Sequence, residues 1–328
     1  MLPMERSGKG AVFIRYAIHA RPEQAPVSTR VDGRPAPAVP ARPGLPGPGS
    51  LGSGRSPDDE ESIKMSRPVR IGVQLQPQHA PDYGLIRDAV LRAEDAGVDI
   101  VFNWDHFFPL YGDPDGAHYE CWTMLGAFAE QTERVEIGAL VTGGGYRNPD
   151  LLADMARTVD RISGGRLILG IGSGWFERDY DEYGYDFGTA GSRLNLLKEY
   201  LPRITGRLAK LNPQPVREIP VLIGGGGEKK TLRLVAEYAH IWHSFGELDV
   251  FTHKSQVLDE HCARVGTEFG TIERSVAWPG TEKAPDYLKA GATLFTVGIT
   301  GPDYDLTQVR EAIAWRDEVN PEPVSGIA

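Results

Sequence analysis

Between residues 69 and 319 the chain alternates short apolar runs with longer segments in which apolar residues recur every three or four positions. Short apolar runs are typical of buried β-strands, whereas the longer period is typical of amphipathic helices. The predicted strands are 69–75, 99–104, 135–141, 166–172, 219–224, 241–244, 274–278 and 292–299. The predicted helices are 85–93 (with a stop at Gly97), 119–130, 149–162, 192–209, 228–239, 247–265, 284–290 and 305–319.

The order of these segments predicts the fold class. Eight strands are each followed by a helix, and such alternation implies parallel strands. Eight units favour an α/β fold closed into a (β/α)8 barrel of the TIM type, with an insertion in the long stretch after strand four. An open doubly wound sheet is the alternative, which eight repeats disfavour. In a barrel the active site lies at the carboxyl ends of the strands, so candidate chemistry is sought there.

Residues 1–64 have a different composition from the remainder. They hold ten of the 25 prolines and eight of the 39 glycines. Such segments bury too little apolar surface to offset the entropy of ordering, so we expect a disordered tail over 1–64 and a barrel domain over 65–328. The tail is either a functional arm or a translated stretch upstream of a start at Met65. Because Met65 directly precedes the first strand, the second interpretation is favoured.

The charge balance excludes several classes of partner. The chain has a formal net charge of −10, and residues 65–328 hold 26 basic and 38 acidic residues. An acidic body disfavours binding to nucleic acid or to an anionic membrane surface, and no apolar stretch approaches the roughly 20 residues of a membrane helix. The two cysteines, Cys121 and Cys262, form no CxxC pair, which fits a cytoplasmic location. The groups 118–121 and 240–243 offer no convincing third ligand, so no metal site is expected.

An acid and an imidazole follow the second predicted strand. Asp105 and His106 fall where a barrel places its catalytic residues. A neutral histidine near pH 7 can give or take a proton, and a neighbouring carboxylate can orient it. A packed imidazole in a capped loop is the alternative. The charged run 177–185, after the fourth strand, is interpreted as a solvated loop whose tyrosines could cover a substrate.

Glycine clusters follow three other strands. Residues 143–145 are three glycines that would let a flat ring approach the backbone, and 172–174 again are small. The four glycines 224–227 link a strand to a helix, where free amides and the helix dipole predict an anion site that favours phosphate. Lys229 and Lys230 could add positive charge there. Neither the dinucleotide fingerprint nor the Walker pattern occurs.

Together these motifs resemble the bacterial luciferase-like superfamily, in its coenzyme F420-dependent oxidoreductase branch. The resemblance spans about residues 70–320 and leaves out the tail. The pieces that carry it are AEDAGVDI (93–100), WDHFFP (104–109), YRNP (146–149), ISGGRLILGIGSGW (162–175) and IGGGGEKKTLRLVAEY (223–238).

The resemblance implies hydride transfer between the deazaflavin coenzyme F420 and a small organic substrate. His106 would donate or accept the accompanying proton, and Asp105 would hold His106 in place. A cis peptide bond is expected between Leu140 and Val141. The residues implied to bind the cofactor are Asp105, His106, Leu140, Val141, Thr142, Gly172, Ser173, Gly174, Gly224, Gly225, Gly226, Gly227 and Glu228.

The substrate pocket is predicted to contain Trp104, Phe108 and Trp175. Some relatives that oxidise a sugar phosphate carry glutamate after the strand-four glycines, and Trp175 in that place puts such a substrate in doubt. The resemblance also implies a homodimer. Two alternatives stay open: an FMN-dependent monooxygenase on the same barrel, and a non-catalytic protein that binds flavin or deazaflavin.

Overall fold

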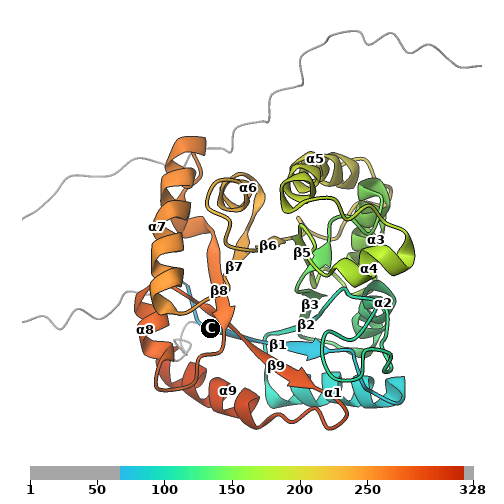
Figure 1. The fold of residues 1–328 in the computed structure, drawn as a ribbon. Helices are drawn as coiled ribbons and strands as arrows, with labels where there is room; N and C mark the ends of the chain where they lie inside the picture. The colour runs from blue at the N-terminus through green and yellow to red at the C-terminus, as the bar shows by residue number, and fades with distance from the viewer. Residues whose placement is uncertain (1–66, 321–328) are drawn as a thin grey trace, which may run out of the picture. The chain divides into compact units, whose positions relative to one another are not determined.

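A computed structural model of the protein describes residues 67–320. Helices surround a ring of strands (Figure 1). The strands are β1 (Arg70–Gln76), β2 (Ile100–Asn103), β3 (Glu136–Ala139), β4 (Thr142–Gly143), β5 (Leu167–Gly172), β6 (Val221–Gly224), β7 (Ile241–His243), β8 (Glu273–Ala277) and β9 (Leu294–Thr300). The helices are α1 (Tyr83–Ala96), α2 (Cys121–Gln131), α3 (Pro149–Ile162), α4 (Glu177–Tyr183), α5 (Ala190–Leu208), α6 (Thr231–Tyr238), α7 (Leu248–Val265), α8 (Ala284–Lys289) and α9 (Thr307–Val319), with a 3-10 turn at Phe269–Thr271.

The strands form one parallel sheet that closes on itself. Their order is β3-β2-β1-β9-β8-β7-β6-β5-β4, and β3 also pairs with β5, with Ile137 opposite Leu167. The two-residue β4 resumes pairing with β5 after β3 has ended, and the expected cis peptide bond between Leu140 and Val141 lies between β3 and β4. The predicted (β/α)8 barrel is therefore confirmed, and the open doubly wound sheet is wrong.

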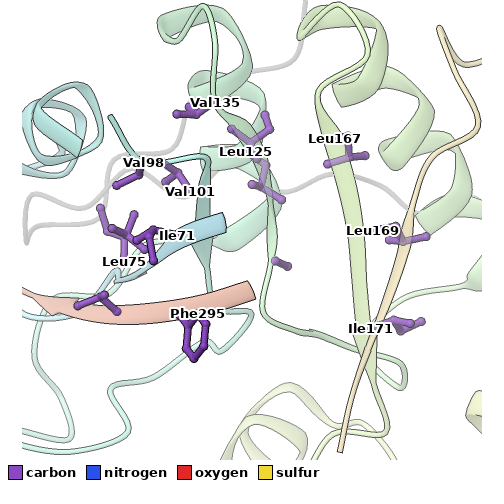
Figure 2. Packing of buried hydrophobic residues seen from close by; sticks show 14 of the residues in the cluster. Ile71, Leu75, Val98, Val101, Leu125, Val135, Leu167, Leu169, Ile171 and Phe295 are labelled. Carbon is purple, nitrogen blue, oxygen red and sulfur yellow. The ribbon is translucent and has the colours of Figure 1, made fainter. Parts of the chain in front are cut away.

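Apolar side chains pack in two layers, because successive residues of a strand point to opposite faces. The outer layer lies between the strands and the helices, where Ile71 and Leu75 of β1 pack in one cluster with Leu125 of α2 (Figure 2). A second, smaller cluster is separate from this outer layer, and its residues all come from the strands or from the residue directly after β3. They are Ile100, Phe102, Leu140, Ile168, Leu222, Ile241 and Leu294, with Val141 packed against them.

The amino ends of the strands are joined by an ionic cluster. Arg70, the first residue of β1, lies 2.5 Å from Glu136 of β3 and also pairs with Glu273 of β8. The Glu273 carboxylate is buried, and two guanidinium nitrogens of Arg70 donate to its two oxygens. This cluster lies at the end of the barrel opposite the catalytic face, so it serves the fold and not the chemistry.

Local signals placed most element boundaries within a few residues. Helix α3 begins as predicted at Pro149, where the Asn148 side chain accepts from the amides of Asp150 and Leu151. Helix α1 ends at Ala96, and Gly97, its C-cap, has a φ of 99°.

One element was wrongly predicted. The run 177–185 is not a solvated loop, because it begins with helix α4, whose Asp179 and Tyr180 are buried. Together with α5, this helix occupies the insertion after the fourth barrel strand, β5. The prediction for residues 1–64 lies outside the described residues. Within residues 67–320, no helix has the length and apolar character needed to cross a membrane.

Candidate active site

The segment that follows β2 carries the two residues predicted to be catalytic, and both are buried. Nδ1 of His106 lies 2.7 Å from Oδ2 of Asp179, which belongs to α4. Asp105 faces a different partner, Arg147. The prediction that Asp105 holds His106 in place is therefore wrong. The carboxylate that contacts the His106 ring is that of Asp179.

Asp179 is fully buried and accepts hydrogen bonds at both carboxylate oxygens. The Tyr146 hydroxyl donates to Oδ2 at 2.8 Å, and the backbone amide of Phe107 donates to Oδ1 at 3.0 Å. A carboxylate can only accept, so Nδ1 of His106 carries the hydrogen in its contact with Asp179. Burial and the charge of Asp179 raise the pKa of Tyr146, which keeps its hydroxyl protonated. Three hydrogen-bond donors, none of them an arginine or lysine, thus surround this buried carboxylate.

Asp105 belongs to a neighbouring ion pair. Its two oxygens accept from the two terminal nitrogens of Arg147, at 2.5 and 3.0 Å, and the Gly143 amide donates from 3.3 Å. Arg147 also donates to Glu120 at 2.6 Å. Burial alone would lower the pKa of Arg147, but the Asp105 carboxylate outweighs this effect and raises it. The ion pair between Asp105 and Arg147 thus connects the segment after β2 with the segment after β4.

Aromatic rings enclose His106. Trp104, Trp175 and Phe176 form T-shaped contacts with its ring, with centroid separations of 5.9, 5.7 and 5.5 Å. The buried Trp104 donates its indole hydrogen to Nε2 of His118 at 3.2 Å, and burial lowers the pKa of His118 to about 4, so that nitrogen is free to accept. Trp175 is 63% exposed. Among the residues described, Nε2 of His106 has no hydrogen-bond partner, so it is available to a ligand.

The three predicted substrate-pocket residues differ in position. Trp104 forms a buried wall beside His106, and Trp175 exposes its ring next to His106. Phe108 instead packs under the Arg178 guanidinium, 4.0 Å from the ring centroid, and against Tyr183. It therefore helps hold α4, and no ring contact joins it to His106 within the described chain.

Small residues surround the partly exposed side chain of Val141. A β-carbon at Gly172 would lie 2.8 Å from Cγ2 of Val141, and one at Gly224 would lie 3.2 Å from Cγ1. The carbonyl of Leu140 accepts from Gln74 at 2.7 Å. Thr142 is fully buried, and its hydroxyl accepts from Trp122 at 2.8 Å. The structure thus brings Val141, Gly172 and Gly224 together, with Ser173 and Gly174 following on the β5 end.

The glycine-rich turn after β6 has unused amides. The Gly225 amide donates to the His243 carbonyl at 3.1 Å, whereas those of Gly226 and Gly227 have no backbone partner within residues 67–320. The predicted cation Lys230 instead donates to Asn195, and Lys229 is exposed. Lys254 of α7 is the cation at this turn: it donates to the Gly226 carbonyl at 2.6 Å and to Glu228 at 3.2 Å.

A separate cleft of about 330 Å³ lies at the carboxyl end of β9. Its lining includes Ile299, Thr300, Asp303 and Gln308, and none of the predicted site residues. The residues 67–320 contain no group of three or more histidine, cysteine, aspartate or glutamate side chains that could hold a metal ion.

The family model described as luciferase-like monooxygenase matches residues 64–279. The chain belongs to this family.

Relatives of this luciferase-like protein include an F420-dependent glucose-6-phosphate dehydrogenase of Amycolatopsis mediterranei, 30% identical over 190 residues, 52% of this chain and 54% of the relative. A pyrimidine monooxygenase, RutA, of Variovorax paradoxus is 26% identical over 202 residues, 52% and 51% of the two chains. The chain thus spans about half the length of these two curated relatives.

Solved structures share the barrel at low sequence identity. The coenzyme F420-dependent tetrahydromethanopterin reductase from Methanopyrus kandleri has a TM-score of 0.62 and 17% identity, over 75% of this chain and 97% of that one. An F420-dependent secondary alcohol dehydrogenase in complex with an F420-acetone adduct has a TM-score of 0.65 and 16% identity, over 73% and 96%. At these identities the likeness concerns the fold.

Sequence reasoning missed four residues of the site of this luciferase-like protein: Asp179, Tyr146, Arg147 and Lys254. Tyr146 and Arg147 lie in the motif YRNP, which was noted without a role for either side chain. Asp179 and Tyr180 lie one helical turn before Tyr183, a spacing that is typical of one face of a helix. The many charged residues in this run favoured a solvated loop instead. Lys254 carries no local signal, because α7 reaches the turn only through the fold.

Proposed function

We propose that this luciferase-like protein is an oxidoreductase that moves a hydride between coenzyme F420 and a small organic substrate. The observation that carries the proposal is that His106, with a free Nε2, opens onto the same end of the barrel as the glycine-lined Val141 and the unused amides of Gly226 and Gly227. The F420-dependent relatives and structural neighbours support the choice of cofactor.

The residues present fit such a cofactor. A β-carbon at Gly172 or Gly224 would meet the Val141 side chain, so the two glycines let Val141 lie close to the strand ends. The flat ring of the cofactor would stack on this surface of Val141 and glycine backbone. The amides of Gly226 and Gly227, near the start of α6, suit an anionic group, and Lys254 adds a positive charge beside them. Leu140, Val141, Gly172, Ser173, Gly174 and the turn from Gly224 to Glu228 would hold the cofactor.

Coenzyme F420, when bound, supplies a two-electron hydride donor or acceptor at C5 of its deazaflavin ring. The chain supplies the proton. Nε2 of His106 gives a proton to the substrate when the substrate is reduced, and takes one when it is oxidised. The rings of Trp104, Trp175 and Phe176 pack against the imidazole, so a substrate that reaches Nε2 would lie among aromatic groups.

We propose a neutral substrate with an apolar or aromatic part. The exposed ring of Trp175 stands beside His106, where it would pack on such a group. This placement also weighs against a sugar phosphate, although sugar-phosphate dehydrogenases are among the relatives.

A titration of the purified protein with F420 and with FMN tests the cofactor. Tight quenching of deazaflavin fluorescence, with weak binding of FMN, supports the proposal. The reverse result favours the FMN-dependent monooxygenase, an alternative that the similarity to a pyrimidine monooxygenase keeps in view. Binding of F420 without turnover of any compound in a panel of ketones, enones and alcohols would point to the non-catalytic protein.

We also propose that the protein works as a cytoplasmic homodimer, as the family resemblance implies. Light scattering coupled to size-exclusion chromatography, repeated over a hundredfold dilution, tests the assembly. A mass equal to one chain at all concentrations would contradict the proposal of a dimer.

A further inference from the structure

Within residues 67–320, the buried carboxylate of Asp179 has no arginine or lysine partner. Its described contacts are His106, Tyr146 and the Phe107 amide. An ionised carboxylate kept in the interior without an arginine or lysine is expensive to bury, so its retention calls for a role. We propose that Asp179 is the positioning residue that holds His106 with Nε2 directed at the reacting atoms, and that Tyr146 tempers this effect. The inference rests on the proposed function of His106.

Helix α4 is firmly docked at the position that this role requires. Arg178 donates to the Pro114 carbonyl at 2.6 Å and to Asp115 at 2.7 Å, and its guanidinium covers Phe108. The ring of Tyr183 stacks on Phe107 with centroids 4.2 Å apart. Helix α4 therefore contacts Phe107 and Phe108, the two residues that directly follow His106. Through these contacts the helix fixes both Asp179 and the backbone that carries the imidazole.

The contact with Asp179 determines which nitrogen of His106 exchanges the proton. Because the carboxylate accepts from Nδ1, the neutral ring presents a lone pair at Nε2, and the cation presents Nε2–H. The proton therefore enters and leaves at Nε2, while the Nδ1 hydrogen stays on the contact with Asp179. Without the carboxylate, the hydrogen can move to Nε2, and the neutral ring can then no longer accept a proton there.

Tyr146 shares the same carboxylate oxygen as His106. Its hydroxyl donates to Oδ2 from 2.8 Å, and this competing donor withdraws negative charge from the contact with Nδ1. The other ionisable groups near the imidazole are Asp105, which is neutralised by Arg147, and His118, which burial keeps neutral. The balance between Asp179 and Tyr146 is thus the part of the surroundings that acts directly on Nδ1.

This arrangement predicts opposite effects for two conservative substitutions. Asp179→Asn removes the charged acceptor of the Nδ1 hydrogen, so the neutral ring shifts toward the Nε2–H form and the Nδ1 proton signal of His106 moves upfield or is lost. Tyr146→Phe removes the competing donor, so the contact with Asp179 strengthens and the Nδ1 proton signal moves downfield. Asp181→Asn is the matched control: it removes one carboxylate from an exposed position of the same helix and leaves the tautomer and the Nδ1 proton signal unchanged.

The experiment is nitrogen-15 and proton NMR of the cofactor-free protein, labelled at histidine, which reports both the tautomer and the Nδ1 proton signal of His106. We expect Nδ1–H in the parent and a shift toward Nε2–H in Asp179→Asn. With F420 and a turned-over substrate, kcat falls by about a hundredfold or more in Asp179→Asn, while the Kd for F420 stays within about threefold. Asp179→Glu restores part of kcat.

Shifts of the same sign in both variants, or an unchanged tautomer in Asp179→Asn, would overturn the proposal. If Asp179→Asn does not fold, the downfield shift of the Nδ1 proton signal in Tyr146→Phe decides the question, and its absence counts against the positioning role. The NMR readout needs no cofactor. A failure of F420 to bind therefore refutes the proposed function alone, and normal binding with an unchanged tautomer refutes the role of Asp179 alone.

Discussion

Removing Arg147 should destabilise the fold strongly and in a pH-dependent way. Its side chain is 10% exposed and lies 2.5 and 3.0 Å from the oxygens of the buried Asp105. In Arg147→Met the carboxylate keeps only the Gly143 amide, 3.3 Å away. Breaking a buried pair by removing one partner costs about 3–5 kcal/mol, because the remaining charge is uncompensated. We expect a loss of about 3–4 kcal/mol at pH 7, since that amide still donates.

The sign of the pH dependence follows from the same charge. In the variant, an unpaired buried Asp105 has a pKa above its unfolded value, so the destabilisation is largest at neutral pH and shrinks as the pH falls toward 4 and the carboxyl takes up a proton. The double variant Asp105→Asn with Arg147→Met removes both charges and should regain part of the loss.

Urea denaturation followed by tryptophan fluorescence, at pH 7 and pH 5, measures both effects. Arg203→Met is the matched control, because Arg203 forms a 2.7 Å pair with Asp150 in which the side chains are 43% and 46% exposed. The free energy of unfolding of that control should hardly change. The reasoning fails if Arg147→Met costs no more than the control, or if the double variant is no more stable than Arg147→Met.

The other predictions concern the site. His106→Ala should lower kcat by about 10²–10⁴-fold with little change in the Kd for F420, and parallel losses in stopped-flow turnover and fluorescence titration would make it a binding residue instead. Lys254→Met should weaken F420 binding roughly tenfold at low salt, an effect that titration in rising salt should diminish. Trp175→Ala should raise KM for aromatic substrates about fivefold and leave the unfolding midpoint unchanged, because an exposed ring contributes little to the core. A lower Tm without a change in KM would contradict that role.

The fold was readable from the sequence because local pattern and global topology agree. The alternation of short apolar runs and amphipathic segments specified eight units, and parallel strands in eight units close with little ambiguity. Capping residues such as Asn148 and stop residues such as Gly97 set boundaries by local hydrogen bonding alone. Such signals act within a few residues and need no tertiary context.

The site was only partly readable because its contacts join distant parts of the chain. His106 could be singled out from its place after a strand, but its partner Asp179 lies 73 positions later. Asp105 was the wrong choice of partner because adjacency in sequence does not bring two side chains together. Asp179 was hidden in a charged run that looks solvated, and its burial follows from the docking of α4 by Phe107 and Phe108. The electrostatics of the site therefore depend on tertiary packing.

The closing seam of the barrel has a consequence for synthesis of the chain. Strand β1 is among the first described residues to leave the ribosome, yet its seven-residue register with β9, from Arg70 opposite Leu294 to Gln76 opposite Thr300, forms only when the carboxyl-terminal strand has emerged. Until then β1 and β8 are unpaired edges, which are templates for aggregation. A nascent chain halted before Leu294 would carry the His106, Asp179 and glycine-turn segments but no closed barrel to hold them. Only a chain that includes β9 can therefore close the barrel and bring the site residues together. A shorter chain keeps its strand edges exposed, and a cell must protect or degrade it.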